Sequence, residues 1–246
     1  MRKEMLRTED VKKHFGSVRA VDGVSIGVKE GEIVSLVGPN GAGKTTLLNL
    51  ISGLLKPDSG RVYFMGEDVT GMRPSQLVRK GMARCFQISN VFEDLTVLEN
   101  LLAAVHSIEG WISPVRRYDD DEAVERAMAV LKEFNLHEKA HLTPKELSHG
   151  DRKLLDVAIA YALNPKMILL DEPTAAMSVG EKRTTVRVIK KLRDQLGVTV
   201  LLVEHDLDVV YEVSDRIIVM HQGTVLAEGR PEEVREDPKV KEVYLG

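Results

Sequence analysis

Short apolar runs alternate along this chain with segments in which apolar residues recur every three or four positions. The runs 33–37, 167–170 and 198–203 have the length of strands and are mostly apolar, which is typical of strands covered on both faces. The stretch 95–163 instead has mainly helical spacing. Strands and helices in alternation predict an α/β fold with a largely parallel sheet.

The two ends of the chain have a different pattern. Residues 6–11 and 24–28 alternate between polar and apolar side chains, which predicts antiparallel strands with an exposed edge. Near the other end, a His-Gln-Gly turn separates the strand-like runs 216–220 and 224–228, and this arrangement predicts a hairpin. We therefore expect antiparallel pairing at both ends of the chain.

Composition narrows the class of protein. Of the 246 residues, 43% are hydrophobic, which is enough for a sizeable core. No apolar run approaches the ~18 residues that span a bilayer, and the chain begins in mixed charge without an apolar signal region. The one cysteine, Cys85, excludes an internal disulfide and is expected to be a small buried apolar residue. These features favour a cytosolic chain, and the net charge of −4 argues against nucleic-acid binding.

The most specific motif lies between a strand-like run and a helical one. Residues 38–45 match the phosphate-binding pattern G-x-x-x-x-G-K-[ST] at every fixed position. Its glycines let backbone N–H groups curl around phosphate oxygens, and the following helix adds the positive end of its dipole. Lys44 supplies a charge for the terminal phosphates, and Thr45 supplies a hydroxyl ligand for Mg²⁺. The candidate nucleotide-binding residues of this loop are Gly38, Pro39, Asn40, Gly41, Ala42, Gly43, Lys44, Thr45 and Thr46.

Two acidic residues and a second anion-facing loop complete the candidate chemistry. Asp171 and Glu172 follow the strand-like run 167–170, where the carboxyl ends of parallel strands form the ligand edge of a sheet. We expect Asp171 to hold Mg²⁺ through water and Glu172 to polarise the water that attacks the γ-phosphate. The loop Leu-Ser-His-Gly-Asp at 147–151 precedes a helical run and also presents donors to an anion. Because the first loop already cradles one nucleotide, the second predicts a composite site completed by another subunit.

These motifs occur in the order and at the spacing of the ATP-binding-cassette ATPases, which the chain resembles over nearly its whole length. In that family 147–151 is the signature loop. Gln87 matches the glutamine-loop residue, His205 matches the switch histidine, and Phe15 occupies the position of the aromatic residue that stacks on adenine. The resemblance implies one nucleotide-binding domain with a P-loop NTPase fold. Residues 1–87 and 164–246 would form the RecA-like core and an antiparallel β subdomain, and 88–163 the helical signature subdomain.

The resemblance also implies a role for each motif. Two ATPase subunits would pack head to tail around two ATP molecules, and Ser148 and Gly150 of one subunit would contact the γ-phosphate held by the other. Gln87 would reach Mg²⁺, Glu172 would act as the base, and His205 would support the γ-phosphate. The implied catalytic residues are Glu172, His205 and Lys44, and the implied metal ligands are Thr45, Gln87 and Asp171.

Three positions depart from the family pattern and affect the expected coupling between subunits. His149 replaces the first signature glycine, and Asp151 replaces a glutamine, although aspartate is a good helix N-cap. Ser178 lies where the dimer-interface loop usually carries aspartate.

Two segments, 81–101 and 229–246, resemble the ATPase subunits of branched-chain amino-acid importers. In that family two ATPases serve two integral membrane permease subunits and a periplasmic or extracellular solute-binding protein. The ATPases then lie peripherally on the cytoplasmic side of the membrane. The alternatives are urea or amide importers, the lipopolysaccharide-export ATPase, and a soluble assembly ATPase of the iron–sulfur type.

Two further patterns have a simpler interpretation. Residues 137–141 match the zinc-protease string H-E-x-x-H, but five residues with three fixed positions are a weak signal, and Pro144 should end any helix there. We expect a solvated helix end instead. The apolar residues Phe86, Val91, Phe92 and Leu95 could be plain core; our hypothesis is that some of them line a groove for a helix of the membrane subunit.

Overall fold

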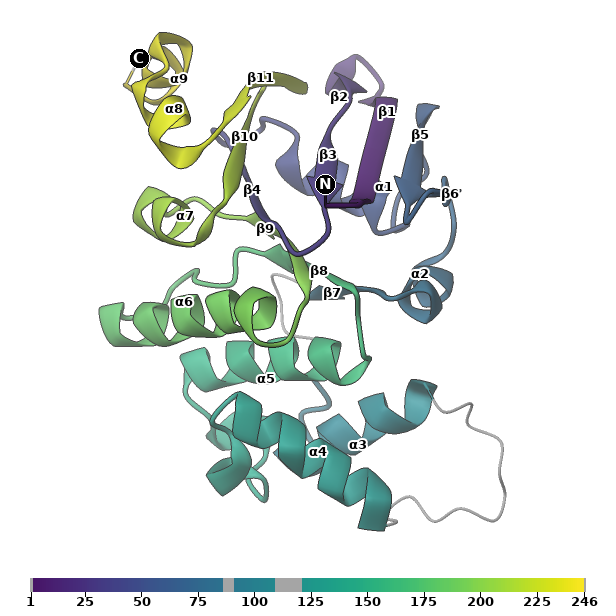
Figure 1. Cartoon of the computed structure of the whole chain (residues 1–246), viewed down its shortest axis with the longest axis vertical. Coiled ribbons are helices and arrows are strands. Elements are labelled where there is room, and N and C mark those ends of the chain that lie inside the picture. Colours follow the sequence, from purple (N-terminus) through teal and green to yellow (C-terminus); the bar gives the residue numbers. More distant parts are fainter. Residues whose placement is uncertain (1, 86–90, 109–120, 246) are drawn as a thin grey trace.

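A six-stranded, mostly parallel sheet forms the centre of the computed structural model, which describes residues 2–85, 91–108 and 121–245 (Figure 1). The strands run parallel to their neighbours except at one edge, where β11 pairs antiparallel with β10. Every residue of β4, β8 and β9 is buried, which confirms the strands expected from the apolar runs, and the expected hairpin is β10–β11. In sheet order the strands are β11 (Thr224–Gly229), β10 (Arg216–His221), β4 (Ile33–Val37), β9 (Thr199–Val203), β8 (Met167–Asp171) and β7 (Met82–Cys85).

A second, antiparallel sheet lies beside the first, and its central strand corrects one expectation. Strand β1 pairs with β2 and β3 on one side and with β5 on the other, so the segment 6–11 is not an exposed edge. Leu6 and Val11 are fully buried. The segment 24–28 is also divided, because one strand ends at Val24 and the next begins at Gly27. The strands are β1 (Glu4–Phe15), β2 (Val18–Val24), β3 (Gly27–Lys29), β5 (Ser59–Phe64) and β6 (Glu67–Asp68).

The helices gather at the ends and flanks of the sheets. Helices α3, α4 and α5 lie together at the end of the molecule opposite the C-terminal helices α8 and α9 (Figure 1). Their shared core includes Leu101, Leu131 and Leu155, which confirms the helical spacing expected there. The helices are α1 (Lys44–Ile51), α2 (Pro74–Lys80), α3 (Val97–Ile108), α4 (Asp121–Glu133), α5 (His149–Ala162), α6 (Val179–Asp194), α7 (Leu207–Val213), α8 (Pro231–Glu236) and α9 (Pro238–Leu245), with short 3₁₀ turns η1 (His137–Lys139) and η2 (Pro144–Glu146).

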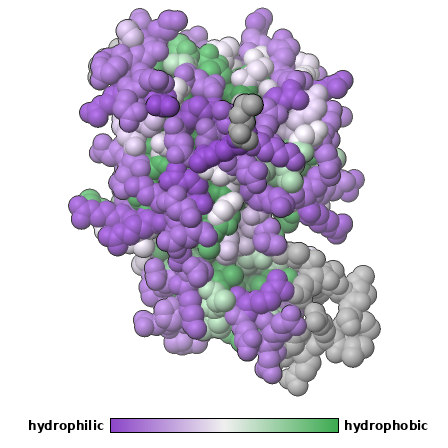
Figure 2. All heavy atoms as spheres, in the orientation of Figure 1, coloured by the Kyte–Doolittle hydropathy of each residue, from purple (hydrophilic) through white to green (hydrophobic). Residues whose placement is uncertain are grey.

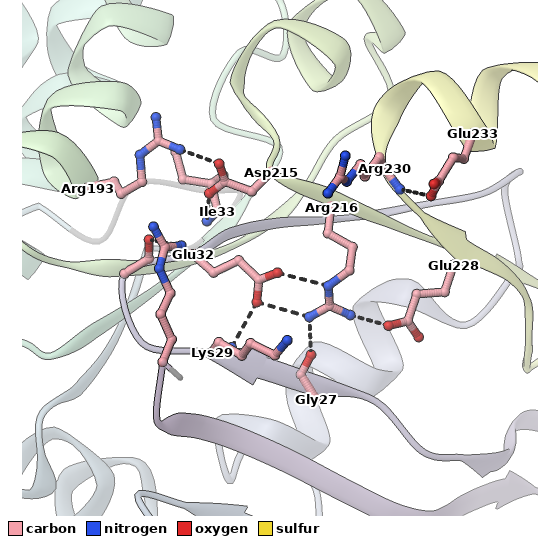
Figure 3. A network of polar contacts seen from close by, with 12 residues as sticks. Gly27, Lys29, Glu32, Ile33, Arg193, Asp215, Arg216, Glu228, Arg230 and Glu233 are labelled. Carbon is pink, nitrogen blue, oxygen red and sulfur yellow. Dashed lines mark hydrogen bonds and ion pairs between the residues drawn. The ribbon is translucent and has the colours of Figure 1, made fainter.

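A charged network fastens the antiparallel sheet to the main sheet (Figure 3). Arg216 of β10 donates to both Glu32 carboxylate oxygens, at 2.9 and 3.0 Å, and to the Gly27 carbonyl of β3 at 2.5 Å. It also pairs with Glu228 of β11. Burial tends to raise the pKa of Glu32, but the bonds from Arg216 and from the Lys29 amide outweigh it and lower that pKa. The network therefore joins the small sheet to the main sheet at the start of β4 and β10, the end of these strands opposite the phosphate loop.

The visible surface is mainly hydrophilic, with hydrophobic side chains showing between polar ones near the top of the view and toward the helical end (Figure 2). Within the described ranges, none of the helices has the length and apolar character that crossing a membrane requires. The H-E-x-x-H string begins in a three-residue 3₁₀ turn and not in an α-helix, so the zinc-protease geometry does not form.

Candidate functional site

The phosphate loop joins β4 to α1 and folds around Lys44. The Lys44 ammonium donates to the Gly38 carbonyl at 2.7 Å and to the Pro39 carbonyl at 3.0 Å. Burial is the main cause that lowers the pKa of Lys44, and the nearby charges of Glu172 and Asp171 partly oppose it. The two carboxylates that the sequence predicted for catalysis and metal binding thus lie within electrostatic reach of the loop's cation.

Close backbone packing explains two glycines of this loop. Gly43 has φ +100°, and a Cβ built on it would lie 2.1 Å from the Ala20 carbonyl oxygen. A Cβ on Gly38, whose φ is +149°, would lie 2.2 Å from the Met220 carbonyl oxygen. Since both positions combine positive φ with a backbone clash, only glycine fits. The loop therefore packs closely between β2 and β10.

A cleft of about 670 Å³ opens over this loop. It brings together most of the predicted loop residues with Glu172 and His205. Phe15 lies outside the lining, at the end of β1, where it is 49% exposed. The residues that line the cleft are Ser17, Val18, Arg19, Ala20, Asn40, Gly41, Ala42, Gly43, Lys44, Thr45, Thr46, Glu172, His205 and Gln222. Sequence reasoning missed Val18, Arg19 and Gln222, because they come from β2 and the β10–β11 turn and carry no motif of their own.

Glu172 and His205 meet at the edge of the cleft. His205 Nε2 lies 2.8 Å from Glu172 Oε1, so the imidazole N–H can donate to the carboxylate. Glu172 has φ +50°, an uncommon conformation for a residue with a side chain, and its amide donates to the Val203 carbonyl at 2.9 Å. Such local strain is often found at functional sites, where surrounding contacts maintain it. The pair has the geometry of a base held in place by an adjacent imidazole.

Glu204 positions the loops that carry this pair, although no sequence motif marks it apart from its neighbour His205. Its side chain is 2% exposed. Glu204 Oε1 accepts from the Thr174 amide at 2.9 Å and from the Thr174 hydroxyl at 2.5 Å, while Oε2 accepts from the His205 amide at 2.9 Å. A buried carboxylate therefore links the segment after Glu172 to the backbone of His205.

Asp171 ends strand β8 and is held by an arginine from the neighbouring strand. Arg84 donates from Nη2 to Asp171 Oδ2 at 2.8 Å, and from Nη1 to Asn49 of α1 and to Ser52, the C-cap of α1, both at 2.7 Å. Next to it, Cys85 is buried, and burial raises its thiol pKa, as expected of an unreactive apolar residue.

The donors near the loop fit a magnesium ion. Thr45 is exposed within the cleft, and Asp171 ends strand β8, close enough to Lys44 for its charge to affect the pKa of that lysine. Among the described residues, His, Cys, Asp and Glu side chains form no group of three or more that could hold a metal alone. Mg²⁺ typically takes one or two protein oxygens, substrate phosphates and several waters, so a hydroxyl and a carboxylate suit it. Gln87, the third predicted ligand, lies outside the described residues.

The signature loop lies apart from this cleft in the same chain. Ser148 is the N-cap of α5 and accepts from the Asp151 amide, so the cap of this helix is the serine and not the aspartate. Asp151 lies in the first turn instead, because Ser148 already has the extended backbone of a cap. Ser148 and Gly150 line a separate cavity between α5 and α6, away from the residues of the cleft.

Two of the three departures from the family pattern, His149 and Ser178, link the signature loop to the segment 175–181. His149 Nε2 lies 3.2 Å from the Ala175 carbonyl oxygen. Ser178 caps α6, and its amide and hydroxyl donate to Glu181 Oε2 at 2.9 and 2.7 Å. The other oxygen of Glu181 accepts from the Gly150 amide at 3.0 Å. The signature loop is thereby tied to the loop that follows Glu172.

The C-terminal helix also reaches the phosphate loop. Burial is the main cause that raises the pKa of Tyr244 in α9 to about 12, and a hydrogen bond with the Gly38 backbone partly opposes it. Val240 of the same helix packs in a cluster with Val37, the last residue of β4. The end of the chain is therefore part of the nucleotide-binding lobe.

A shallow groove of about 410 Å³ lies between α3 and α5. Phe92, at its rim, is 61% exposed, whereas Val91 and Leu95 are half-buried and Val91 packs against the core. The Asn100 side chain fixes Phe92 by accepting from its amide at 2.8 Å and donating to its carbonyl at 3.1 Å. Phe86 lies outside the described residues.

Comparison with protein families and relatives agrees with this geometry. A family described as ABC transporter matches residues 21–175, and one described as branched-chain amino acid ATP-binding cassette transporter matches residues 224–246. The chain is 41% identical to a probable branched-chain amino acid transport ATP-binding protein LivG of Methanocaldococcus jannaschii, over 99% of this chain and 98% of that protein. It is 38% identical to the high-affinity branched-chain amino acid transport ATP-binding protein BraF of Pseudomonas aeruginosa, over 100% of this chain and 99% of that protein.

Solved structures of similar chains have the same fold. A nucleotide-free ATP-binding cassette from an ABC transporter superposes with a TM-score of 0.88 at 39% identity, covering 99% of both chains. The ADP conformation of such a cassette gives 0.88 at 40% identity with the same coverage. A dimeric bacterial ABC transporter cassette gives 0.81 at 31% identity, covering 92% of this chain and 99% of that one.

Proposed function

Because the chain belongs to the ABC transporter family as an ATP-binding cassette ATPase, we propose that it powers the import of branched-chain amino acids or close analogues. Support comes from full-length relatives that carry this transport in their names and from the match of residues 224–246 to the branched-chain amino acid cassette family. ATP binding would close a dimer of cassettes, and hydrolysis would open it again.

One observation carries the mechanism. Lys44, Glu172 and His205 line a single cleft, whereas Ser148 and Gly150 lie outside it. A cleft with a cation, a base and an imidazole can bind and hydrolyse a nucleotide phosphate, but a signature loop outside it needs a second cassette. The dimeric cassette among the similar structures supports a pair of cassettes for this chain, and we propose that the two pack head to tail.

The roles of individual residues follow from their positions. The loop amides and Lys44 would bind the phosphates, and Glu172 would take a proton from the attacking water while His205 holds the carboxylate. Mg²⁺ would neutralise charge on the phosphates, with Thr45 as a ligand and Asp171 as a partner of its water shell. Phe15 remains our proposal for adenine stacking, since its exposed ring lies two residues from the cleft residue Ser17.

We place the working protein peripherally on the cytoplasmic side of a membrane, with two permease subunits and a solute-binding protein as further partners. The groove beside Phe92 would take a helix of a permease subunit, and the helical subdomain 88–163 would carry that contact.

The test is a tagged purification from gently solubilised native membranes, followed by identification of the chains that copurify. Recovery of two multi-span proteins with a cassette ATPase supports the importer, and binding assays on the associated solute-binding protein would then identify the substrate. Recovery of cytosolic partners alone would refute the transport proposal while leaving the ATPase assignment intact.

A further inference from the structure

The two signature donors are already bonded within this chain. The Gly150 amide donates to Glu181 Oε1 at 3.0 Å, and the Ser148 hydroxyl donates to Asp151 Oδ2 at 2.9 Å. Under the proposed function, on which this inference rests, these same two groups contact the γ-phosphate held by the partner. We propose that Asp151 and Glu181 set the affinity of the signature loop for that phosphate, because the phosphate must replace both carboxylates at the same donors.

Glu181 is firmly held in this position. Its other oxygen, Oε2, accepts the Ser178 amide and hydroxyl in a capping box at the start of α6. The Ser178 hydroxyl, followed by the amides of Ser178 and Gly150, lowers the pKa of Glu181 to about 2, so the carboxylate is ionised at neutral pH. It therefore presents a full negative charge where a phosphate oxygen would bind.

Gly150 permits this close approach. A Cβ built on Gly150 would lie 2.7 Å from Glu181 Oε1 and 2.8 Å from its Cγ. Because Gly150 has no side chain, its amide can be reached by the Glu181 carboxylate from α6. The same space would let the γ-phosphate held by the partner reach that amide. A cavity of about 150 Å³ beside the contact, bordered by Leu154, Gly180 and Thr184, leaves the Glu181 side chain space to turn away.

Asp151 adds a second charge that the usual family residue would not have. Its Oδ2 accepts from the Ser148 hydroxyl and, at 2.5 Å, from the Lys139 ammonium. A neutral glutamine at this position could hydrogen-bond to the serine but would not repel a phosphate. The departure at residue 151 thus has a physical consequence. It makes it less favourable for the Ser148 hydroxyl to exchange the Asp151 carboxylate for a γ-phosphate oxygen.

The experiment measures ATP-driven dimer formation in a Glu172→Gln background, which slows hydrolysis. Light scattering after size exclusion gives the ATP concentration for half-maximal dimer in four chains: the background alone and with Glu181→Gln, Asp151→Asn or Glu146→Gln. The Gln and Asn side chains retain an acceptor but lose the charge. Glu146 is the matched control, because it accepts the same pair of capping bonds from Thr143 at a different helix start.

We expect Glu181→Gln and Asp151→Asn each to lower the half-maximal ATP concentration about threefold to tenfold, and Glu146→Gln to leave it unchanged. Amide hydrogen exchange at Gly150 in the ATP-free monomer should also become faster in Glu181→Gln. An unchanged or higher ATP requirement in both variants, with unchanged thermal melting, would overturn the inference. If Glu181→Gln fails to fold, Asp151→Asn alone decides it.

The same titration separates this inference from the proposed function. A background chain that fails to bind ATP would refute the proposed function. A background chain that binds ATP but stays monomeric at every ATP concentration would overturn the inference for a dimer of two copies of this chain. The assignment of ATP binding would still hold.

Discussion

Arg84 and Asp171 form a buried ion pair, with side chains 7% and 4% exposed, at the point where β7 and β8 meet α1. The arginine uses one nitrogen for Asp171 and the other for Asn49 and Ser52, so one side chain orients the strand-end carboxylate relative to the helix of the phosphate loop. Arg84 lies three residues before Gln87 in the chain. The pair therefore connects the strand-end acidic residues to the helix of the phosphate loop, two motifs that are far apart in the sequence.

Removing the Arg84 side chain should leave the buried Asp171 carboxylate without its charged partner. Arg84→Met is expected to lower the free energy of unfolding by about 3–5 kcal/mol, because Asp171 loses its charged partner. Arg84→Met combined with Asp171→Asn should recover part of that loss, since no buried charge then remains. Urea unfolding of the parent, both single variants and the double variant measures the coupling, and a loss below about 1 kcal/mol for Arg84→Met would contradict it.

Replacing the base should separate binding from hydrolysis. Glu172→Gln keeps a polar side chain beside His205 but cannot accept a proton, so we expect ATP hydrolysis to fall about 10²–10⁴-fold. Equilibrium binding of ATP should stay within about twofold of the parent, because the loop and Lys44 are untouched. Steady-state hydrolysis and filter binding test the two parts, and hydrolysis at the parent rate would refute the assignment of Glu172.

The close approach at Gly43 should make it far less tolerant than Gly41, its neighbour in the same loop. Gly43→Ala forces a Cβ against the Ala20 carbonyl at positive φ, and we expect a loss of more than about 2 kcal/mol of stability together with loss of ATP binding. Gly41 also has positive φ, but a Cβ there meets nothing within 4 Å, so Gly41→Ala should cost only about 1 kcal/mol. Thermal melting compares the two, and equal losses would show that backbone conformation alone matters.

The Glu32–Arg216 pair should make stability depend on pH. The pKa of Glu32 is lowered in the folded chain, so its contribution is present above the unfolded value of 4.5 and is lost as the pH falls through the folded value. Glu32→Gln should cost about 2 kcal/mol at pH 7, and the difference from the parent should shrink as the pH falls below 4.5. The control is Glu228→Gln, which removes the more exposed partner of Arg216 and should cost less than about 1 kcal/mol. Urea unfolding from pH 3 to 8 gives both curves, and a difference that does not vary with pH would contradict this account.

Phe92 offers a test of coupling to the membrane. Its ring is 61% exposed at the rim of the α3–α5 groove, so Phe92→Ala should leave folding and ATP binding unchanged while reducing transport at least about threefold. Leu54, 45% exposed and outside that groove, provides the control variant Leu54→Ala. Transport into vesicles that contain the assembled complex is the measurement, and normal transport by Phe92→Ala would remove the groove from the proposal.

Local sequence predicted the parts of the fold that local chemistry determines. The apolar runs at β4, β8 and β9 became fully buried strands, and the turn before Thr224 formed the expected hairpin. The central position of β1 was not predictable in the same way, because its partner β5 begins more than forty residues later and pairing between distant strands leaves little local signal.

The residues of the candidate site also fall into two groups, those that a sequence motif marks and those that only their contacts in the structure reveal. Lys44, Glu172 and His205 belong to motifs, and the structure brings them into one cleft. Glu204 and Arg84 carry no motif, and their importance appears only once burial shows which carboxylate or amide each one contacts. Ser148, and not Asp151, caps α5, because the cap requires the extended backbone conformation that Ser148 has, and composition does not encode that conformation.

The contacts of the Lys44 ammonium have a thermodynamic consequence. Since Lys44 bonds to the carbonyls of Gly38 and Pro39, and Gly43 is confined by the Ala20 carbonyl, contacts within the chain hold the loop in its curved shape. An arriving phosphate need not organise a mobile segment, and so little of its binding energy is spent on lost chain entropy. Recognition here is an exchange of partners within a preorganised receptor, and rapid association with little structural rearrangement follows from it.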